Sequence, residues 1–232
     1  MEKGPRANRA LIRAINRSRV LNTIKNTGPV SRTSVARRTG LSAATITSIS
    51  SELIESGLIF EKEAGDSSGG RRPILLALNT RGSCVIGLKL AEDHVTGALT
   101  DLRATVIAKL TRPLSDQSLD SAIETMSRVV ESLLEQKQYG NQQFLGVGVG
   151  LAGIIDHNRG VLRHSPIFGW NNIPLGDLLA NRLGVPIYID NDVNTLTITE
   201  LWFGKGKGVD NFLTVTIGRG VGLGIVLNGQ VV

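Results

Sequence analysis

Apolar residues in the first third of the chain recur at intervals of three or four, which predicts three short helices. The first is predicted over residues 18–27 and is stopped by Gly28–Pro29. Ser31 and Ser42 are placed to cap a second helix that ends near residue 40 and a third that runs to about residue 56. Their buried faces are expected to carry Val20, Leu21, Ile24, Val35, Ala36, Ile46, Ile49, Leu53 and Ile54.

The second and third predicted helices are separated by a short turn that contains Gly40, and this is the spacing of a helix-turn-helix. The third helix begins with small residues that could reach the floor of a DNA groove, where hydroxyls bind bases or phosphates and methyl groups contact thymine. Arg32, Arg37 and Arg38 lie on or beside the second helix, where this motif usually contacts the DNA backbone. The predicted groove contacts are Ser42, Ala43, Ala44, Thr45, Thr47 and Ser48.

A β-hairpin is predicted directly after the third helix. Residues 58–60 and 74–79 have the pattern of strands, and the segment between them is polar and rich in Gly. Arg71 and Arg72 follow two glycines at its tip, which suits them to phosphates or to a narrow minor groove. A small helical bundle with solvated arginines is the alternative. The helix order, turn glycine, hairpin and basic tip together favour a winged helix-turn-helix domain of the α+β class over residues 1–80.

The pattern changes from Cys84 onward. Three strands joined by short turns come first, and helices that alternate with buried strands follow. This order resembles the actin/hexokinase (ribonuclease-H-like) fold, so we expect an α/β domain over residues 81–232. Its elements are predicted over residues 84–90, 95–102 and 105–110 (strands), 119–136 (helix), 144–156 (strand and turn), 175–183 (helix), 186–189 (strand), 191–204 (helix) and 212–232 (strand, Gly-rich turn, strand).

The charge along the chain is uneven. Residues 1–82 carry 14 Lys and Arg against 6 Asp and Glu, whereas the remainder carries 12 against 14. A basic third joined to a mildly acidic remainder indicates a polyanion-binding module attached to something else, although a charged tail would give the same balance. Apolar residues make up 41% of the chain, too many for a disordered protein, and no apolar run reaches the ~18 residues of a membrane span. Because Cys84 is the single cysteine and no secretory signal is visible, we expect the cytoplasm.

Several stretches resemble the ROK (repressor, open reading frame, kinase) family. GPVSRTSVARRTGLSAATITSISSELIESGLI with the following SSGGRRP is similar to the winged helix-turn-helix of ROK repressors. GVGLAGIID, GWNNIPL, DNDVN and GRGVGLGI are similar to the family's sugar-kinase-like domain, so the resemblance covers about residues 15–232. It implies a sugar-responsive transcriptional regulator, a repressor of carbohydrate-utilisation genes. Its partners would be a double-stranded DNA operator, bound by a homodimer, and a sugar or sugar-phosphate effector.

The candidate sugar site follows the buried strand PIYI. A carboxylate accepts hydrogen bonds, whereas an amide both donates and accepts them, and neighbouring sugar hydroxyls need both kinds of partner. By resemblance, Asp192 matches the general base of ROK kinases, Asn191 matches a sugar ligand, and Gly153 matches a turn that presents backbone amides to the sugar. From the residues alone, Asn191 and Asp192 could instead cap the next helix, and Gly153 could be a turn glycine without a ligand. Glu200 could face the same site, but a solvated helix carboxylate is the favoured interpretation.

The alternative function is a ROK sugar kinase with an added DNA-binding domain. In the family's kinases, the first phosphate loop has a sequence close to Gly-x-Asp-x-Gly-Gly-Thr. In this chain Lys89 replaces the Asp, and Glu92 and Asp93 would repel phosphates. The second loop keeps its glycines and has Arg219 in place of a Thr. We therefore expect no catalytic activity and no cofactor. Ile167 also replaces an Asn that contacts the sugar in the family, which leaves the identity of the sugar open.

The resemblance also suggests looking for a zinc site, because ROK proteins commonly carry a His and a Cys cluster that bind this metal. This sequence has no Cys cluster, and His94, His157 and His164 do not match the motif. We expect no metal here. From the apolar ending LNGQVV we also expect a chain that lacks the second half of the fold.

Overall fold

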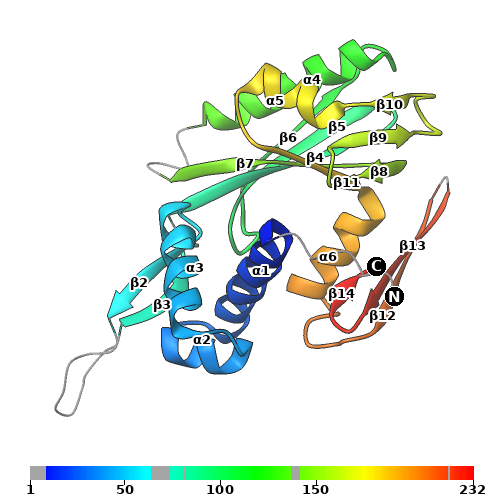
Figure 1. Ribbon diagram of the computed structural model, residues 1–232. Coiled ribbons are helices and arrows are strands. Elements are labelled where there is room, and N and C mark those ends of the chain that lie inside the picture. Colours follow the sequence, from blue (N-terminus) through cyan, green and yellow to red (C-terminus); the bar gives the residue numbers. More distant parts are fainter. Residues whose placement is uncertain (1–8, 64–73, 81, 137–141, 219) are drawn as a thin grey trace. The chain divides into compact units, whose positions relative to one another are not determined.

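The computed structural model describes residues 9–63, 74–80, 82–136, 142–218 and 220–232, with side chains from residue 12 onward (Figure 1). Contacts between residues divide the chain into two compact units, Met1–Ser83 and Cys84–Val232. Within the described residues, no helix has both the length and the apolar character that crossing a membrane requires.

The N-terminal unit contains the three predicted helices and a small sheet with strand order β1-β3-β2. The first helix begins at Arg9, well before the predicted start at residue 18. Its early turns were not predicted, because they expose even apolar residues such as Ile12 and Ile15 and so have no buried apolar stripe. The two-residue strand β1 was not predicted, since two residues are too few to show an alternation. The elements are α1 (Arg9–Thr27), β1 (Val30–Ser31), α2 (Arg32–Thr39), α3 (Ala43–Glu55), β2 (Ile59–Glu63) and β3 (Ile74–Leu78).

The ends of α2 and α3 confirm the predicted helix-turn-helix. The Ser31 hydroxyl accepts the Ser34 N–H at 3.2 Å, and the Ser42 hydroxyl accepts the Thr45 N–H at 3.2 Å. Gly40 ends α2 with a φ of 70°, a left-handed conformation that costs glycine little. The turn between the two helices is therefore fixed by local chemistry that the sequence shows.

One hydrophobic core holds the helices of this unit against the hairpin. The Ser83 hydroxyl and the Asn79 amide both donate to the Gly57 carbonyl, at 2.7 Å and 3.1 Å, and so tie the exit of β3 to the end of α3. The core is built from Val20, Ile24, Val30, Val35, Ile46, Ile49, Leu53, Ile59 and Leu76.

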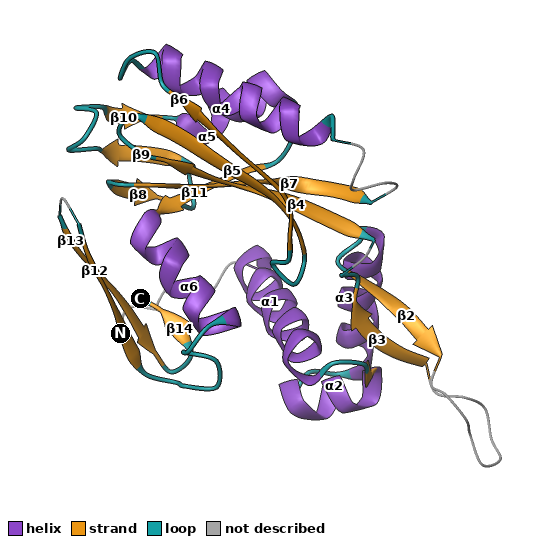
Figure 2. Cartoon of the chain, turned by 180° about the vertical axis from the view of Figure 1, so that it is seen from behind, coloured by secondary structure: helices purple, strands orange, loops and turns teal. Residues whose placement is uncertain are grey.

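The C-terminal unit is built on a five-stranded sheet with order β11-β7-β4-β5-β6. The first three strands in the sequence form an antiparallel meander, and β11 pairs parallel to β7. Helices α4 and α5 cover one face of this sheet (Figures 1 and 2). These elements are β4 (Ser83–Leu90), β5 (His94–Asp101), β6 (Val106–Pro113), α4 (Leu119–Leu134), β7 (Gln143–Leu151), α5 (Leu175–Leu183) and β11 (Ile187–Asn191).

Two smaller three-stranded sheets complete the unit, with orders β10-β9-β8 and β12-β13-β14. The strands β9, β10 and β14 were not predicted, because two to four residues give too little alternation. Helix α6 packs against β12 and β13. The elements are β8 (Ile154–Asp156), β9 (Val161–His164), β10 (Asn171–Ile173), α6 (Asp192–Phe203), β12 (Phe212–Ile217), β13 (Val221–Leu227) and β14 (Gln230–Val231).

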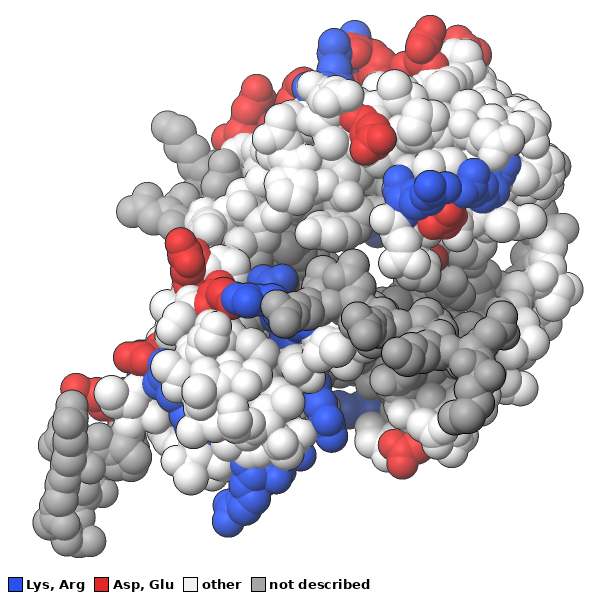
Figure 3. Space-filling view, viewed as in Figure 1, with Lys and Arg blue, Asp and Glu red and all other residues white. Residues whose placement is uncertain are grey.

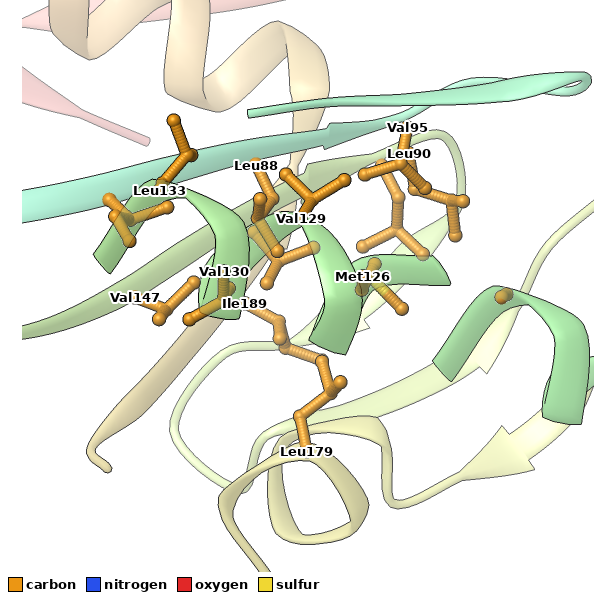
Figure 4. Close-up of a cluster of buried hydrophobic side chains, with 14 of the residues drawn as sticks. Leu88, Leu90, Val95, Met126, Val129, Val130, Leu133, Val147, Leu179 and Ile189 are labelled. Carbon is orange, nitrogen blue, oxygen red and sulfur yellow. The ribbon is translucent and has the colours of Figure 1, made fainter. Parts of the chain in front are cut away.

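The core between the large sheet and α4 fixes which side chains face away from it. Figure 4 shows Leu88 and Leu90 of β4 packed toward Val129 and Met126 of α4. Because side chains alternate along a strand, Lys89 lies on the opposite, exposed face of β4. These two observations place Lys89 on the face of the sheet that α4 does not cover.

Candidate DNA-binding surface and sugar site

The start of α3 exposes the small residues that the sequence analysis selected. Thr45 is half-buried, and its hydroxyl lies 2.8 Å from that of Ser42, so these two side chains mainly hold the cap. The Thr47 hydroxyl donates to the Ala43 carbonyl at 2.9 Å, which leaves its methyl group and its oxygen lone pairs accessible. The exposed members are Ser42, Ala43, Ala44, Thr47 and Ser48.

The predicted backbone-contacting arginines differ in their surroundings. Arg37 and Arg38 are exposed at the end of α2. Arg32 is half-buried, and its guanidinium donates to the Glu61 carboxylate on β2 at 2.6 Å. A guanidinium has five N–H donors, so Arg32 keeps donors for a phosphate while Glu61 orients it. Nothing local in the sequence links Glu61 to Arg32, and our sequence reasoning missed this pair.

A second unpredicted contact joins α1 to α3. Arg13 donates to the Glu52 carboxylate, which also accepts the Ser48 hydroxyl at 3.5 Å. Figure 3 shows Lys and Arg side chains gathered around α1 and α2 of this unit. Arg71 and Arg72 lie outside the described residues, so their place at the wing tip stays a prediction.

In the C-terminal unit, Asn191 is the N-cap of α6. Its side-chain oxygen accepts the N–H groups of Val193 at 2.8 Å and Asn194 at 3.4 Å, and its amide donates to the Gly153 carbonyl at 2.9 Å. The helix-cap alternative is therefore correct for Asn191. An amide has two N–H bonds, so one of them remains for a ligand.

Position 153 requires glycine for steric reasons. It has a φ of 151°, and a Cβ at this position would lie 2.5 Å from the His164 carbonyl oxygen. The turn between β7 and β8 therefore needs glycine for the close approach of β9, whatever else it does. The structure brings Gly153 and Asn191 together as expected, through a hydrogen bond between them.

Asp192 is the first residue of α6, and its carboxylate is the acceptor left open in this region. The neighbouring Asp190 carboxylate already accepts the Asn191 N–H at 2.7 Å and the Asn194 amide at 3.1 Å. No N–H or O–H group of the described residues donates to the Asp192 carboxylate, whose Oδ2 lies 3.9 Å from the Lys89 ammonium. This contact joins residues far apart in the sequence, and no local signal indicates it.

The segment matched to the first phosphate loop is a tight hairpin turn. The Ala91 N–H donates to the His94 carbonyl at 2.9 Å, so this backbone amide is not available to a phosphate. The Asp93 carboxylate lies 2.6 Å from Nδ1 of His94, and this hydrogen bond lowers the pKa of Asp93. The turn therefore presents a carboxylate that stays ionised, in a place where a phosphate would need donors.

The glycines matched to the second phosphate loop fall into two groups. Gly222 and Gly224 belong to β13, and a Cβ on them would overlap Val193 and Thr197 of α6. At Gly218 and Gly220 a Cβ would meet nothing within 4 Å. The glycines in the strand thus permit close packing of α6, whereas those in the turn have no such role. Arg219 lies outside the described residues.

Two further expectations concern Glu200 and zinc. Glu200 is half-buried rather than solvated, and its carboxylate accepts the Lys205 N–H at 2.9 Å, which stabilises the end of α6. Across the ranges that the structure describes, no group of three or more His, Cys, Asp and Glu side chains is placed to hold a metal. Nδ1 of His94 lies 2.6 Å from the Asp93 carboxylate, and Nδ1 of His164 lies 2.9 Å from Oδ1 of Asn171.

The arrangement defines a class: a winged helix-turn-helix unit joined to a sheet-and-helix unit of the sugar-kinase fold. The chain belongs to the ROK family, whose family profile matches residues 85–232. A second profile, described as winged helix-turn-helix DNA-binding, matches residues 13–59.

Relatives match almost the whole of this chain. It is 31% identical to the xylose repressor of Caldicellulosiruptor bescii over 227 residues, which cover 96% of this chain and 56% of that protein. It is 29% identical to the N-acetylglucosamine repressor of Escherichia coli O157:H7 over 221 residues, which cover 95% of this chain and 54% of that protein. The chain therefore spans about half the length of the curated relatives it matches.

Solved structures agree with this assignment. A ROK family transcriptional regulator, described as a homologue of the E. coli MLC protein, matches with a TM-score of 0.82 at 27% identity, over 95% of this chain and 56% of that one. A ROK family glucokinase from Streptomyces griseus matches with a TM-score of 0.58 at 23% identity, over 64% of this chain and 46% of that one. The second likeness shows the fold of the C-terminal unit alone.

Proposed function

We propose that this protein is a sugar-responsive transcriptional regulator that represses genes of carbohydrate use. Its N-terminal unit binds a double-stranded operator as part of a homodimer, with half-sites about one helical turn apart. A sugar bound at Asp192 and Asn191 favours a conformation with lower affinity for DNA. The observation that carries this proposal is the presence, in one chain, of an exposed small-residue helix start on α3 and an open carboxylate at the start of α6.

The DNA half of the proposal is supported by shape and charge together. The first turns of α3 present methyl and hydroxyl groups without bulky side chains, so the helix can come close to base edges. Arg37 and Arg38 are exposed at the end of the preceding helix, and Arg32 is held by Glu61 beside it. These arginines would neutralise backbone phosphates, and DNA affinity should then fall steeply with salt.

The sugar half is supported by the unused hydrogen-bonding capacity at α6. The Asp192 carboxylate can accept from two neighbouring hydroxyls, and Asn191 keeps one N–H to donate. Relatives carry the names xylose repressor and N-acetylglucosamine repressor, so xylose and N-acetylglucosamine are the first sugars to test. A sugar shifts the protein between two states only as far as it binds them differently.

Phosphoryl transfer is not part of the proposed function. The hairpin at Ala91–His94 uses its own backbone amide, and Lys89 stands beside the carboxylate that would have to act as a base. An ATP-coupled assay over xylose, glucose and N-acetylglucosamine should therefore give no ADP above the background without sugar. Sugar-dependent ADP formation would favour the kinase alternative.

The experiment compares two carboxylates that each lie in the first turn of a helix of the same unit. Asp192→Asn should weaken sugar binding by tenfold or more, because a hydrogen bond to a charged group is lost, and it should abolish the effect of the sugar on DNA affinity. Asp177→Asn in α5 is the matched control and should leave both unchanged. Sugar binding is measured by calorimetry, and DNA affinity by fluorescence anisotropy. Equal responses of the two variants would contradict the proposed site.

A further inference from the structure

A lysine stands inside the proposed sugar site. The Lys89 side chain is 64% exposed, and its ammonium lies 3.9 Å from the Asp192 carboxylate. That separation is longer than the 2.7–3.2 Å of a hydrogen bond between nitrogen and oxygen. The three N–H donors of the ammonium are therefore not committed to Asp192, and a ligand at Asp192 would lie within their reach.

The surroundings of Lys89 leave room for such a ligand. Gly87 lies on the same face of β4, two residues earlier, and a Cβ there would meet nothing within 4 Å. On β7, the strand next to β4 in the sheet, a Cβ at Gly148 would also meet nothing within 4 Å. On the other side, Lys89 is paired in register with Thr96 of β5, whose hydroxyl lies 3.0 Å from that of Thr111. Gly87 and Thr96 therefore place a small residue and a hydroxyl-bearing residue beside the ammonium group of Lys89.

We propose that Lys89 is a specificity-determining residue that binds an acidic substituent, a phosphate or a carboxylate, on the effector sugar. This inference rests on the proposed sugar site. A neutral sugar needs only hydroxyl partners, which Asp192 and Asn191 supply. Asp192 alone would repel an acidic sugar, and an ammonium at 3.9 Å offsets that repulsion and adds charged donors.

The alternative role for Lys89 is to neutralise Asp192 without touching the ligand. In that case, loss of the lysine would change the binding of neutral and acidic sugars by the same factor. If Lys89 binds the acid group itself, the loss falls mainly on the acidic sugar. The ratio of the two affinities therefore separates the two roles.

The experiment measures calorimetric dissociation constants of the full chain for glucose, glucose 6-phosphate and glucuronate, and for N-acetylglucosamine with its 6-phosphate. The wild type should bind at least one acidic sugar more tightly than its neutral parent. Lys89→Met keeps the length of the side chain and removes its charge. It should weaken the binding of the acidic sugar about tenfold or more relative to the binding of the neutral parent sugar, as expected for a lost charged hydrogen bond. The phosphate and carboxylate arms show which acid is bound.

Two control variants keep the result interpretable. Lys109→Met removes a lysine from the same face of the sheet, two strands away on β6, and should leave the ratio unchanged. Lys89→Arg keeps the charge and should retain most of the preference. Equal weakening of acidic and neutral sugars by Lys89→Met, or a wild type that prefers neutral sugars, would overturn the role of Lys89 and leave the sugar site standing. Absence of any sugar binding by the wild type would overturn the proposed function itself.

Discussion

The glycines of β13 offer a sharp test of how α6 is held. A Cβ added at Gly224 would overlap the Thr197 hydroxyl and lie 2.9 Å from the Thr197 Cβ. Two carbon atoms pack best at about 3.5–4.0 Å, so the approach is roughly 0.6 Å too short. Rotation of the buried Thr197 side chain cannot relieve it, because its Cβ is fixed to the helix backbone. Gly224→Ala therefore forces α6 and β13 apart.

The expected cost is that of overpacking a well-filled interior, about 2 kcal/mol within a range of about 1–3 kcal/mol. Urea unfolding followed by tryptophan fluorescence measures it well, because Trp170 and Trp202 are the only tryptophans and both belong to the C-terminal unit. With an m-value of about 2 kcal/mol/M, the midpoint should fall by about 1 M. Adding Thr197→Ala removes the overlapping oxygen and should restore part of the loss, with a coupling of about 1 kcal/mol.

Gly218→Ala is the matched control, since a Cβ there meets nothing within 4 Å. It should change the free energy of unfolding by less than about 0.5 kcal/mol. Unchanged stability of Gly224→Ala, or an equal loss of stability in the two alanine variants, would contradict this packing requirement. In that case the glycines of the strand would need a reason other than the packing of α6.

Three further predictions concern caps, charge and pH. Ser42→Ala removes the α3 cap and should lower the stability of the N-terminal unit by about 1 kcal/mol in circular dichroism unfolding, whereas retained stability would contradict the cap's role. Arg38→Ala should weaken DNA binding across sequences and reduce the salt slope by about one, and an unchanged slope would exclude a phosphate contact. The Arg163 guanidinium donates to Asp156 at 2.8 Å and lowers its pKa, so Asp156 adds stability above about pH 4 that is lost as the pH falls through the lowered pKa. The stability gap between wild type and Asp156→Asn should accordingly shrink in acid, and a gap that grows would refute this sign.

The sequence predicted the elements whose signals are local. Local signals of this kind are the capping serines, the left-handed Gly40 and the apolar stripe of α3. Each depends on residues only a few positions apart, so it was predicted from the sequence alone, and the structure confirms it. Helix α5 was predicted with its observed bounds for the same reason. The short strands β1, β9 and β10 were missed, because pairing across the fold stabilises them rather than their own pattern.

The candidate site shows the same division. Asn191, Asp192 and Gly153 were selected through the resemblance to the ROK family, and the structure brings Asn191 and Gly153 into contact. Two charged pairs, Lys89 with Asp192 in the candidate sugar site and Arg32 with Glu61 on the separate candidate DNA-binding surface, join residues far apart in the chain. Such contacts depend on strand order and on which face of a strand a residue occupies, which a single sequence does not specify.

The central claim is that one chain binds a specific DNA sequence and that a sugar changes this binding. Selection from random duplexes by the full chain, carried out with and without a mixture of neutral and acidic sugars, tests it most directly. We predict that a shared sequence motif is enriched without sugar, and that the mixture reduces its recovery. No enrichment over random duplexes would contradict the DNA-binding assignment, and enrichment that no sugar alters would contradict the sugar response.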